Sequence, residues 1–221
     1  MKYDFQQASQ DAEKSYGVGG KGDYFVFQKG NNTIQILTPA QVFGIHFLGK
    51  GVRSAICYGK EKGCPHHEAK KPNETDEQYN RRTRVSVKYA VYVLDKADSE
   101  IKLAELPHTV IKAIGELQKN PDWAFDELPM PYNITVVYNP DAAPADMYKI
   151  IPSPNRMGLQ EGFREELTKK YEKFSPIDYV ERRKQKQMKE DGIDIGAETI
   201  VEEQGKIEYP TEDINPEEIP F

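Results

Sequence analysis

Apolar and polar residues alternate most clearly between residues 82 and 94. Five apolar or aromatic residues occupy every second position of this stretch: Val85, Val87, Tyr89, Val91 and Val93. Among the intervening positions are three cations and a further ring, namely Arg82, Arg84, Lys88 and Tyr92. Because successive side chains of a strand point to opposite faces, this period predicts a strand with a buried valine face and a solvated, basic opposite face.

Shorter β-rich segments flank this strand on both sides. They are residues 24–27, 33–37, 100–106, 132–138 and 148–151. The first two are separated by residues 29–32, whose glycine and asparagines tolerate a positive φ, so they predict a hairpin. An amphipathic helix is expected over residues 107–119, with Pro107 in its first turn. This order of elements favours a mainly β fold with peripheral helices around a small antiparallel barrel, and not a parallel α/β sheet.

The pattern changes to helical spacing after residue 154. Apolar residues then recur every three or four positions: Leu159, Phe163, Leu167, Tyr171 and Phe174. Ser175 and Pro176 interrupt this pattern, and a second helix rich in arginine and lysine is expected to follow. The sequence therefore predicts four parts, which are a flexible lead-in (1–22), a core (23–155), C-terminal helices (156–189) and a tail (190–221).

Charge is distributed unevenly along the chain. Its 221 residues contain 30 Lys and Arg and 36 Asp and Glu, a net charge of −6. Residues 190–221 hold eleven of these acids and one lysine, a net charge of −10, which leaves residues 1–189 with +4. The tail lacks a periodic apolar set that would offset the entropy of ordering it, so we expect it to be disordered. Because the body is basic, the acidic isoelectric point does not exclude a polyanion as partner.

Apolar segments long enough for a membrane are missing from the sequence. It contains no run of eighteen apolar residues, and residues 1–22 are polar. We therefore expect neither a spanning helix nor a secretory signal, no membrane partner, and a cytoplasmic location. In that reducing compartment Cys57 and Cys64 are expected to be free thiols or metal ligands, because a structural disulfide is rare there.

Residues 44–68 are irregular and contain both cysteines and three of the four histidines of the chain. Four of these residues, in the order His46, Cys57, Cys64 and His67, supply the nitrogen and sulfur ligands that a tetrahedral zinc site needs. All four positions are then filled by protein, so the predicted zinc is structural and this region is a zinc subdomain. His66 satisfies the spacing as well as His67 does, and two buried thiols beside unrelated histidines are the alternative.

Cations gather around this region. Residues 50–88 hold ten Lys or Arg against five acids, and they include an expected exposed polar loop at residues 70–80. Single-stranded nucleic acid is bound by cations that follow the phosphates and by rings on which bases stack, each ring contributing about 1–3 kcal/mol. The expected contacts of this kind are Phe47, Lys50, Arg53, Tyr58, Arg82, Arg84, Lys88 and Tyr92. The alternative is that the rings fill a small core and the cations are an ordinary solvated surface.

The tail ends in Ile219, Pro220 and Phe221, directly after two acids. An apolar side chain beside a free carboxylate offers one handle for a pocket and another for a basic clamp, so we expect this tip to recruit partners. The acids of the tail are also expected to compete weakly with nucleic acid, an effect that salt reduces. A purely solubilising tail explains the acids but not the terminal phenylalanine.

Taken together, these features resemble the zinc-containing, OB-fold single-stranded DNA-binding proteins of bacteriophages. The resemblance covers residues 23–155 and depends on the opening hairpin, the basic strand and the predicted zinc ligands. That family usually has one His and three Cys as ligands, and His67 stands where the last Cys would be. The acidic tip is similar to that of bacterial single-stranded DNA-binding proteins, with Glu-Ile-Pro-Phe in place of the common Asp-Ile-Pro-Phe.

The resemblance implies an OB-like barrel with an inserted zinc subdomain. It also implies a protein that coats single-stranded DNA without sequence preference during replication, recombination or repair, in the host cytoplasm if the protein is viral. Its tail would dock replication and recombination proteins. Strong cooperativity is not implied, because residues 1–22 are not basic as the corresponding segment of the family is.

Two other functions compete with stoichiometric DNA binding. In the first, a metal-dependent nuclease, the acids would be Asp95, Asp98 and Glu100 with Lys102 beside them on one strand face. Asp95 and Asp98 flank a turn, however, where aspartate is common for local hydrogen bonding. In the second, a zinc-stabilised adaptor of the replication machinery binds no DNA but keeps the metal and the tail.

Overall fold

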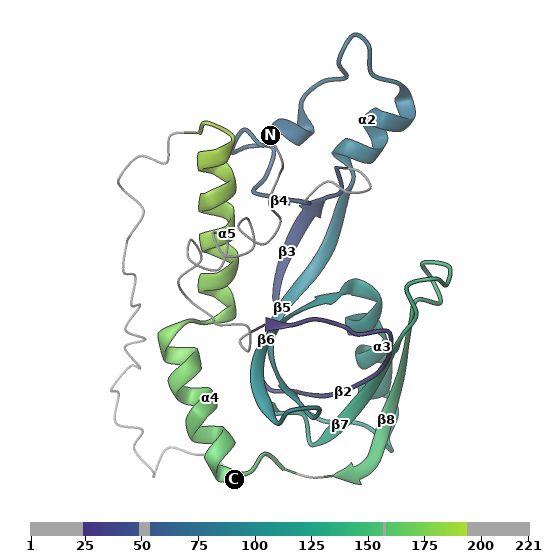
Figure 1. Ribbon diagram of the computed structural model, residues 1–221, viewed down its shortest axis with the longest axis vertical. Helices are drawn as coiled ribbons and strands as arrows, with labels where there is room; N and C mark the ends of the chain where they lie inside the picture. Colours follow the sequence, from purple (N-terminus) through teal and green to yellow (C-terminus); the bar gives the residue numbers. More distant parts are fainter. Residues whose placement is uncertain (1–23, 49–53, 157, 194–221) are drawn as a thin grey trace, which may run out of the picture.

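The computed structural model describes residues 24–48, 54–156 and 158–193. Within these residues the chain is mainly β, with its strands in a single mixed sheet (Figure 1). The eight strands are β1 (Tyr24–Phe25), β2 (Gly30–Ile36), β3 (Gln41–His46), β4 (Ala55–Cys57), β5 (Val85–Asp95), β6 (Glu100–Pro107), β7 (Tyr132–Tyr138) and β8 (Tyr148–Arg156). The predicted lead-in and residues 194–221 of the predicted tail lie outside the described residues.

The long strand β5 organises the sheet. Along one edge it pairs with β2 near its C-terminal end and with β3 over its N-terminal half, and both pairings are antiparallel. Between them residues 37–40 lie opposite only Val91 and Tyr92, so β2 and β3 form one path with a bulge. Pro39 lies in this bulge, where a residue without an N–H donor is tolerated. The bulge lets the chain follow β5 out of the main sheet.

The sheet is open. Its strand order is β1-β6-β5-β2-β7-β8, with β3 and β4 beside β5, and no pairing between β1 and β8 closes it within the described residues. The predicted hairpin of residues 24–37 is wrong, because β1 pairs in parallel with β6 and β2 pairs with β5 and β7. The Asn32 side chain instead closes a turn by accepting from the Gln28 N–H at 2.8 Å and donating to its carbonyl.

Helices follow the predicted pattern in the second half of the chain and depart from it in the first. The described residues contain the 3-10 helix η1 (Pro65–His67) and four α-helices: α2 (Asp76–Thr83), α3 (His108–Lys119), α4 (Glu161–Lys173) and α5 (Pro176–Glu190). Residues 76–83 were expected as loop and the start of a strand, so α2 corrects both expectations. No helix in the described part of the chain is long and apolar enough to cross a membrane.

Buried side chains cover both faces of the sheet. One cluster lies between the sheet and α3, and it includes Val91 and Val93 as expected from their alternation. Residues of β5 on the opposite face are buried too, because Tyr92 and Leu94 pack in a second cluster with the partly buried Phe163 of α4. A third cluster joins β3, β4 and β5 to Val180 of α5. Figure 1 shows α5 running alongside β3 and β4, which extend from the main sheet towards α2.

The predicted exposed basic face of β5 is therefore wrong for the C-terminal half of the strand. Tyr92 is 5% exposed, whereas Val85 and Val87, which were expected in the core, are 38% and 39% exposed. The physical reason is that α4 and α5 cover the face assigned to solvent, while β5 runs beyond the main sheet at its N-terminal end.

Candidate metal centre and the adjoining basic hollow

Four side chains from separate elements meet at the outer end of β3. His46 ends β3, Cys57 ends β4, Cys64 precedes η1 and His67 ends it. One ligand atom from each lies within 4.8 Å of all the others, and His46 and Cys64 are almost completely buried. The structure thus brings together all four predicted ligands, and it selects His67 over His66, which is outside this group.

The local sequence explains how the turns between Cys57 and Cys64 and between Cys64 and His67 bring these three residues together. Gly59 and Gly63 have φ of 103° and 77°, values that residues with a side chain rarely adopt. They let the chain turn tightly after Cys57, and the turn is closed by the Cys64 N–H donating to the Gly59 carbonyl at 3.2 Å. The His67 N–H then donates to the Cys64 carbonyl at 3.1 Å, which forms the Cys-x-x-His knuckle.

Hydrogen bonding fixes which nitrogen of His46 faces the cluster. Its Nδ1 lies 2.9 Å from the Arg82 carbonyl, which only accepts, so Nδ1 carries the proton and Nε2 presents its lone pair. Burial lowers the pKa of His46, followed by the neighbouring His66, and burial raises the pKa of the Cys64 thiol. The lowered pKa of His46 favours the neutral imidazole that binds metals, whereas Cys64 would have to lose its proton on binding a metal.

Distances within the cluster fit a small tetrahedral ion. The Cys57 Sγ is 3.2 Å from the His67 Nε2, and the Cys64 Sγ is 3.7 Å from the His46 Nε2. Zinc bonds of about 2.0–2.1 Å to nitrogen and about 2.3 Å to sulfur place such ligand atoms about 3.5 Å apart in a tetrahedron. Two thiols and two imidazoles are also a common structural zinc set. The cluster is therefore compatible with a metal site.

Arg82, a residue of α2, connects this helix to the metal cluster, which consists of His46, Cys57, Cys64 and His67. Its guanidinium donates to both carboxylate oxygens of Glu74, at 2.8 and 2.9 Å, and to the carbonyls of Pro65 and His66 at 3.3 and 3.1 Å. The sequence placed Arg82 on a strand as a DNA contact, but it lies in α2 and its side chain is only 14% exposed. The structure gives it a bracing role at the cluster instead.

The same pair has a definite pH dependence. Hydrogen bonds from Arg82 lower the pKa of Glu74 to about 2. A carboxyl whose pKa is depressed on folding adds stability above its ordinary pKa and loses it as the pH falls through the folded value. The Arg82–Glu74 pair therefore contributes fully above about pH 4.5 and is lost only towards pH 2.

A basic hollow of about 530 Å³ adjoins the metal cluster on the side of α2. The ring of Phe47, directly after β3, is 45% exposed and lines it. Lys71 and Arg81 line it too; both are exposed, and neither side chain forms an ion pair within the described residues, although the Lys71 N–H donates to Glu74 at 3.1 Å. Glu74 also lies there, but its charge is compensated by Arg82. The hollow thus combines an available ring with two available cations.

Other predicted DNA contacts lie elsewhere. Tyr58 is 4% exposed and its hydroxyl donates to Asp191 at 2.9 Å, and Tyr92 donates to the Phe174 carbonyl at 2.6 Å. Neither buried ring can take a stacked base, so their predicted exposure was wrong. Lys88 is half-buried and pairs with Glu105 at 3.0 Å, and Arg84 is exposed at the end of α2.

Several predicted residues lie outside the described part of the chain. These are Lys50 and Arg53, in the segment that follows Phe47, and the tip residues Ile219, Pro220 and Phe221. Arg81 and Lys71 were missed as individual contacts because sequence shows only that the region is basic. The capping box of Thr75 and Gln78 predicts the helix that exposes Arg81 and was available in the sequence.

Acids once considered for a nuclease site take part in a turn. Lys102 lies 2.9 Å from an oxygen of Asp95 and also forms an ion pair with Asp98. The second oxygen of Asp95 accepts from the Ala97 N–H, and that of Asp98 accepts from the Glu100 N–H. Because each carboxylate already holds both a lysine and a backbone group, this arrangement accounts for them as structural residues.

Tyr58 provides a first test of the site's architecture. Its hydroxyl donates to Asp191 and so connects the turn after Cys57 to the C-terminal end of α5. Burial and the hydrogen bond to Asp191 raise the pKa of Tyr58. Replacing Tyr58 with phenylalanine is expected to lower the free energy of unfolding by about 1 kcal/mol, as measured by urea denaturation. Tyr79→Phe is the matched control, since that hydroxyl has no partner among the described residues. Equal effects of the two changes would contradict the link.

Comparison of the chain with protein-family models, with curated proteins and with solved structures found no match.

Proposed function

We propose that the protein binds single-stranded DNA without sequence preference, as an OB-type module stabilised by a structural zinc ion. The observation that carries the proposal is the basic hollow, where the exposed Phe47 ring adjoins Lys71 and Arg81. Unpaired strands present bases that stack on rings and phosphates that attract cations, and a duplex offers its bases far less readily. An exposed ring between cations suits the unpaired strand better.

The strand arrangement supports an OB-type core. A long bent path made of β2 and β3 pairs along β5, and β5 pairs in turn with β6. OB modules are partly open barrels of this antiparallel kind, and they bind oligonucleotides across one sheet face and its loops. In the proposed module the outward extension of β3, β4 and β5 carries the metal cluster and the basic hollow beyond the sheet.

Zinc is the metal that the ligand set favours, because soft thiolates with imidazoles in a tetrahedron are typical of it. The ion would hold His46, Cys57, Cys64 and His67 together and would leave no position for a catalytic water. Its contribution is to fix β3, β4 and η1 relative to one another, which sets the position of Phe47 at the edge of the hollow. Binding, and not turnover, is therefore the proposed activity.

The proposed role in the cell is to cover exposed strands during DNA replication, recombination or repair. Partner recruitment is assigned to the C-terminal residues Ile219, Pro220 and Phe221, whose apolar side chains and carboxylate suit a pocket with a basic rim. An adaptor without DNA affinity keeps the same tail, so a direct binding measurement separates the two functions.

The first test is a salt series with oligo-dT, duplex DNA and RNA, followed by fluorescence anisotropy. We expect the tightest binding to oligo-dT and a linear loss of log affinity with log salt. In the variant Lys71→Ala with Arg81→Ala, the slope should fall by about 1.4, since each contacted phosphate on a single strand contributes about 0.7. Phe47→Ala should weaken binding about tenfold, within the range for one stacked base.

Two controls make the test specific. Lys112→Ala with Lys149→Ala removes two exposed cations that do not line the hollow, and it should leave the salt slope unchanged. Phe47→Tyr keeps the ring and should keep the affinity. The proposal is wrong if the wild-type chain fails to bind oligo-dT at low salt, and an RNA preference would change the proposed ligand.

A further inference from the structure

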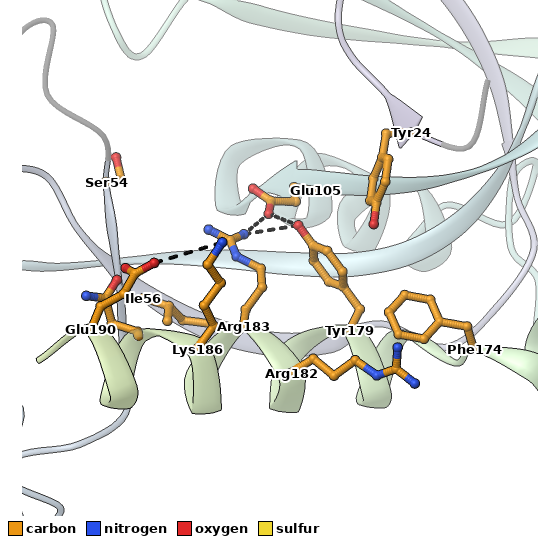
Figure 2. Close-up of a pocket in the computed structure, with 11 residues that line it drawn as sticks. Tyr24, Ser54, Ile56, Glu105, Phe174, Tyr179, Arg182, Arg183, Lys186 and Glu190 are labelled. Atoms are coloured by element: carbon orange, nitrogen blue, oxygen red, sulfur yellow. Dashed lines mark hydrogen bonds and ion pairs between the residues drawn. The ribbon is translucent and has the colours of Figure 1, made fainter. Parts of the chain in front are cut away.

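A second cavity, of about 360 Å³, lies between α5 and the sheet (Figure 2). Its walls come from four places in the sequence: Tyr24 of β1, Ile56 of β4, Glu105 of β6, and the segment from Phe174 to Glu190 that includes α5. The volume is within the range of about 300–1,000 Å³ that is common for small-molecule sites. None of the contacts predicted from the sequence lines this cavity.

Aromatic rings gather at one end of the cavity. Figure 2 shows Tyr24, Tyr179 and Phe174 together there. The centroids of Tyr24 and Tyr179 are 6.0 Å apart, and those of Phe174 and Tyr179 are 6.4 Å apart with the rings at 89°. Tyr24 is 40% exposed. This end presents flat apolar surfaces to whatever enters.

Three cations of α5 also line the cavity. Arg183 and Lys186 lie towards the other end in Figure 2, and Arg182 lies next to the rings, with its guanidinium 4.8 Å from the Phe174 centroid. Arg182 has no carboxylate partner within the described residues, and Lys186 forms an ion pair with Glu190 at 3.9 Å. Three cations therefore line the cavity against two carboxylates, Glu105 and Glu190.

Glu105 neutralises only part of this charge. Its carboxylate accepts a hydrogen bond from the Tyr179 hydroxyl. It also forms ion pairs with Arg183 and, at 3.0 Å, with Lys88. Among the described residues that line the cavity, the three cations exceed the two acids by one, and Lys88 is a further cation that pairs with Glu105 from outside the cavity wall. A surplus of this kind next to exposed rings suits a ligand with an aromatic part and an anionic part.

We infer that this cavity holds one nucleotide of the bound strand, with its base against Tyr24 and Phe174 and its phosphates near Arg182 and Lys186. A nucleotide combines a flat base with phosphates, as this cavity combines aromatic rings with cations. The inference rests on the proposed function and extends it, because it places a second contact region on α5. Phe47 of the basic hollow follows His46, Ser54 of the cavity wall precedes Ala55, and His46 pairs with Ala55, so both regions adjoin the same end of the β3–β4 pair.

The decisive variant is Arg182→Ala with Lys186→Ala. It should weaken oligo-dT binding about tenfold and lower the salt slope by about 1.4, since two phosphate contacts are removed. Lys169→Ala with Lys173→Ala is the matched control, because these exposed cations of α4 have the same charge and do not line the cavity. Circular dichroism and the melting temperature verify that each variant is folded.

Tyr24 tests the aromatic end separately. Tyr24→Leu should weaken binding about fivefold to tenfold, whereas Tyr24→Phe, which keeps the ring, should bind like the wild type. Oligo-dT with one 5-iododeoxyuridine, irradiated in the complex, should crosslink to peptides that contain Tyr24, Phe174 or Tyr179.

The outcomes separate this inference from the proposed function. If the wild type binds oligo-dT but the α5 variant behaves like its control and the crosslinks avoid these peptides, the cavity is not part of the strand site. If the wild type does not bind oligo-dT at all, the proposed function and this inference both fail.

Discussion

Replacing Cys64 with alanine is expected to abolish zinc binding and to unfold the region around the metal cluster. The reason is that hydrophobic burial does not hold the outer part of this region, because neither α2 nor η1 contributes a buried residue. In such regions the free energy of metal binding, about 10–16 kcal/mol in zinc-finger peptides at pH 7, is also the free energy of folding. Hydrogen exchange should show loss of protection from residue 59 to residue 83, while the strands β2, β6 and β7 stay protected.

Adjacent histidines provide the sharpest control for this result. His67→Ala should reduce bound zinc from about one equivalent to none, while His66→Ala should leave the stoichiometry unchanged, since only His67 belongs to the cluster. Elemental analysis after dialysis measures both. Zinc retained by Cys64→Ala, or no zinc in the wild type, would contradict the metal site, and the cluster would then be a set of buried side chains joined by hydrogen bonds.

Sequence pattern predicts those parts of the fold in which a single face is buried. In β7 the buried residues Tyr132, Ile134 and Val136 alternate with less buried ones, and the predicted range agrees with the observed strand. Likewise, α5 begins at the predicted break, where Ser175 and Asp178 form a capping box. Alternating burial and capping depend on residues close together in the sequence, so such elements can be predicted from the sequence.

Long-range packing decides the parts that the pattern could not predict. Alternation in β5 shows that two faces differ, but it does not show that α4 covers Tyr92 or that Val85 lies beyond the main sheet. In the same way, the β2–β3 bulge is visible only once both are paired with β5. The pattern also missed β3 and β4, because residues 44–68 were expected to be irregular.

The candidate metal site could be predicted because cysteine and histidine are rare in this chain and lie close together in the sequence. The choice between His66 and His67 depends on the three-dimensional structure. DNA contacts were harder, because a cation on a solvated surface and a cation in an internal brace look the same in sequence. Arg81 and Arg82 are neighbours in the chain and both line the basic hollow, yet Arg81 is exposed and Arg82 is paired with Glu74. The two side chains differ in their surroundings only because they point in different directions from α2.

Arg82→Lys turns this difference into an experiment. If Arg82 were a phosphate contact, lysine would keep its charge and most of the DNA affinity. As a brace, however, its planar guanidinium donates to both oxygens of Glu74 and to the backbone carbonyls of the metal loop, which a single ammonium cannot reproduce. We therefore expect a melting temperature lower by about 5 °C and zinc released about tenfold faster to a chelator.

Arg81 is the matched control on the same helix. Arg81→Lys should leave stability, zinc release and oligo-dT affinity close to wild type, because the exposed side chain only needs its charge at the hollow. Arg81→Ala should weaken DNA binding without changing the melting temperature. Unchanged stability and unchanged zinc release in Arg82→Lys, with the DNA affinity kept, would contradict the bracing role and would fit a phosphate contact in the hollow, which Arg82 also lines.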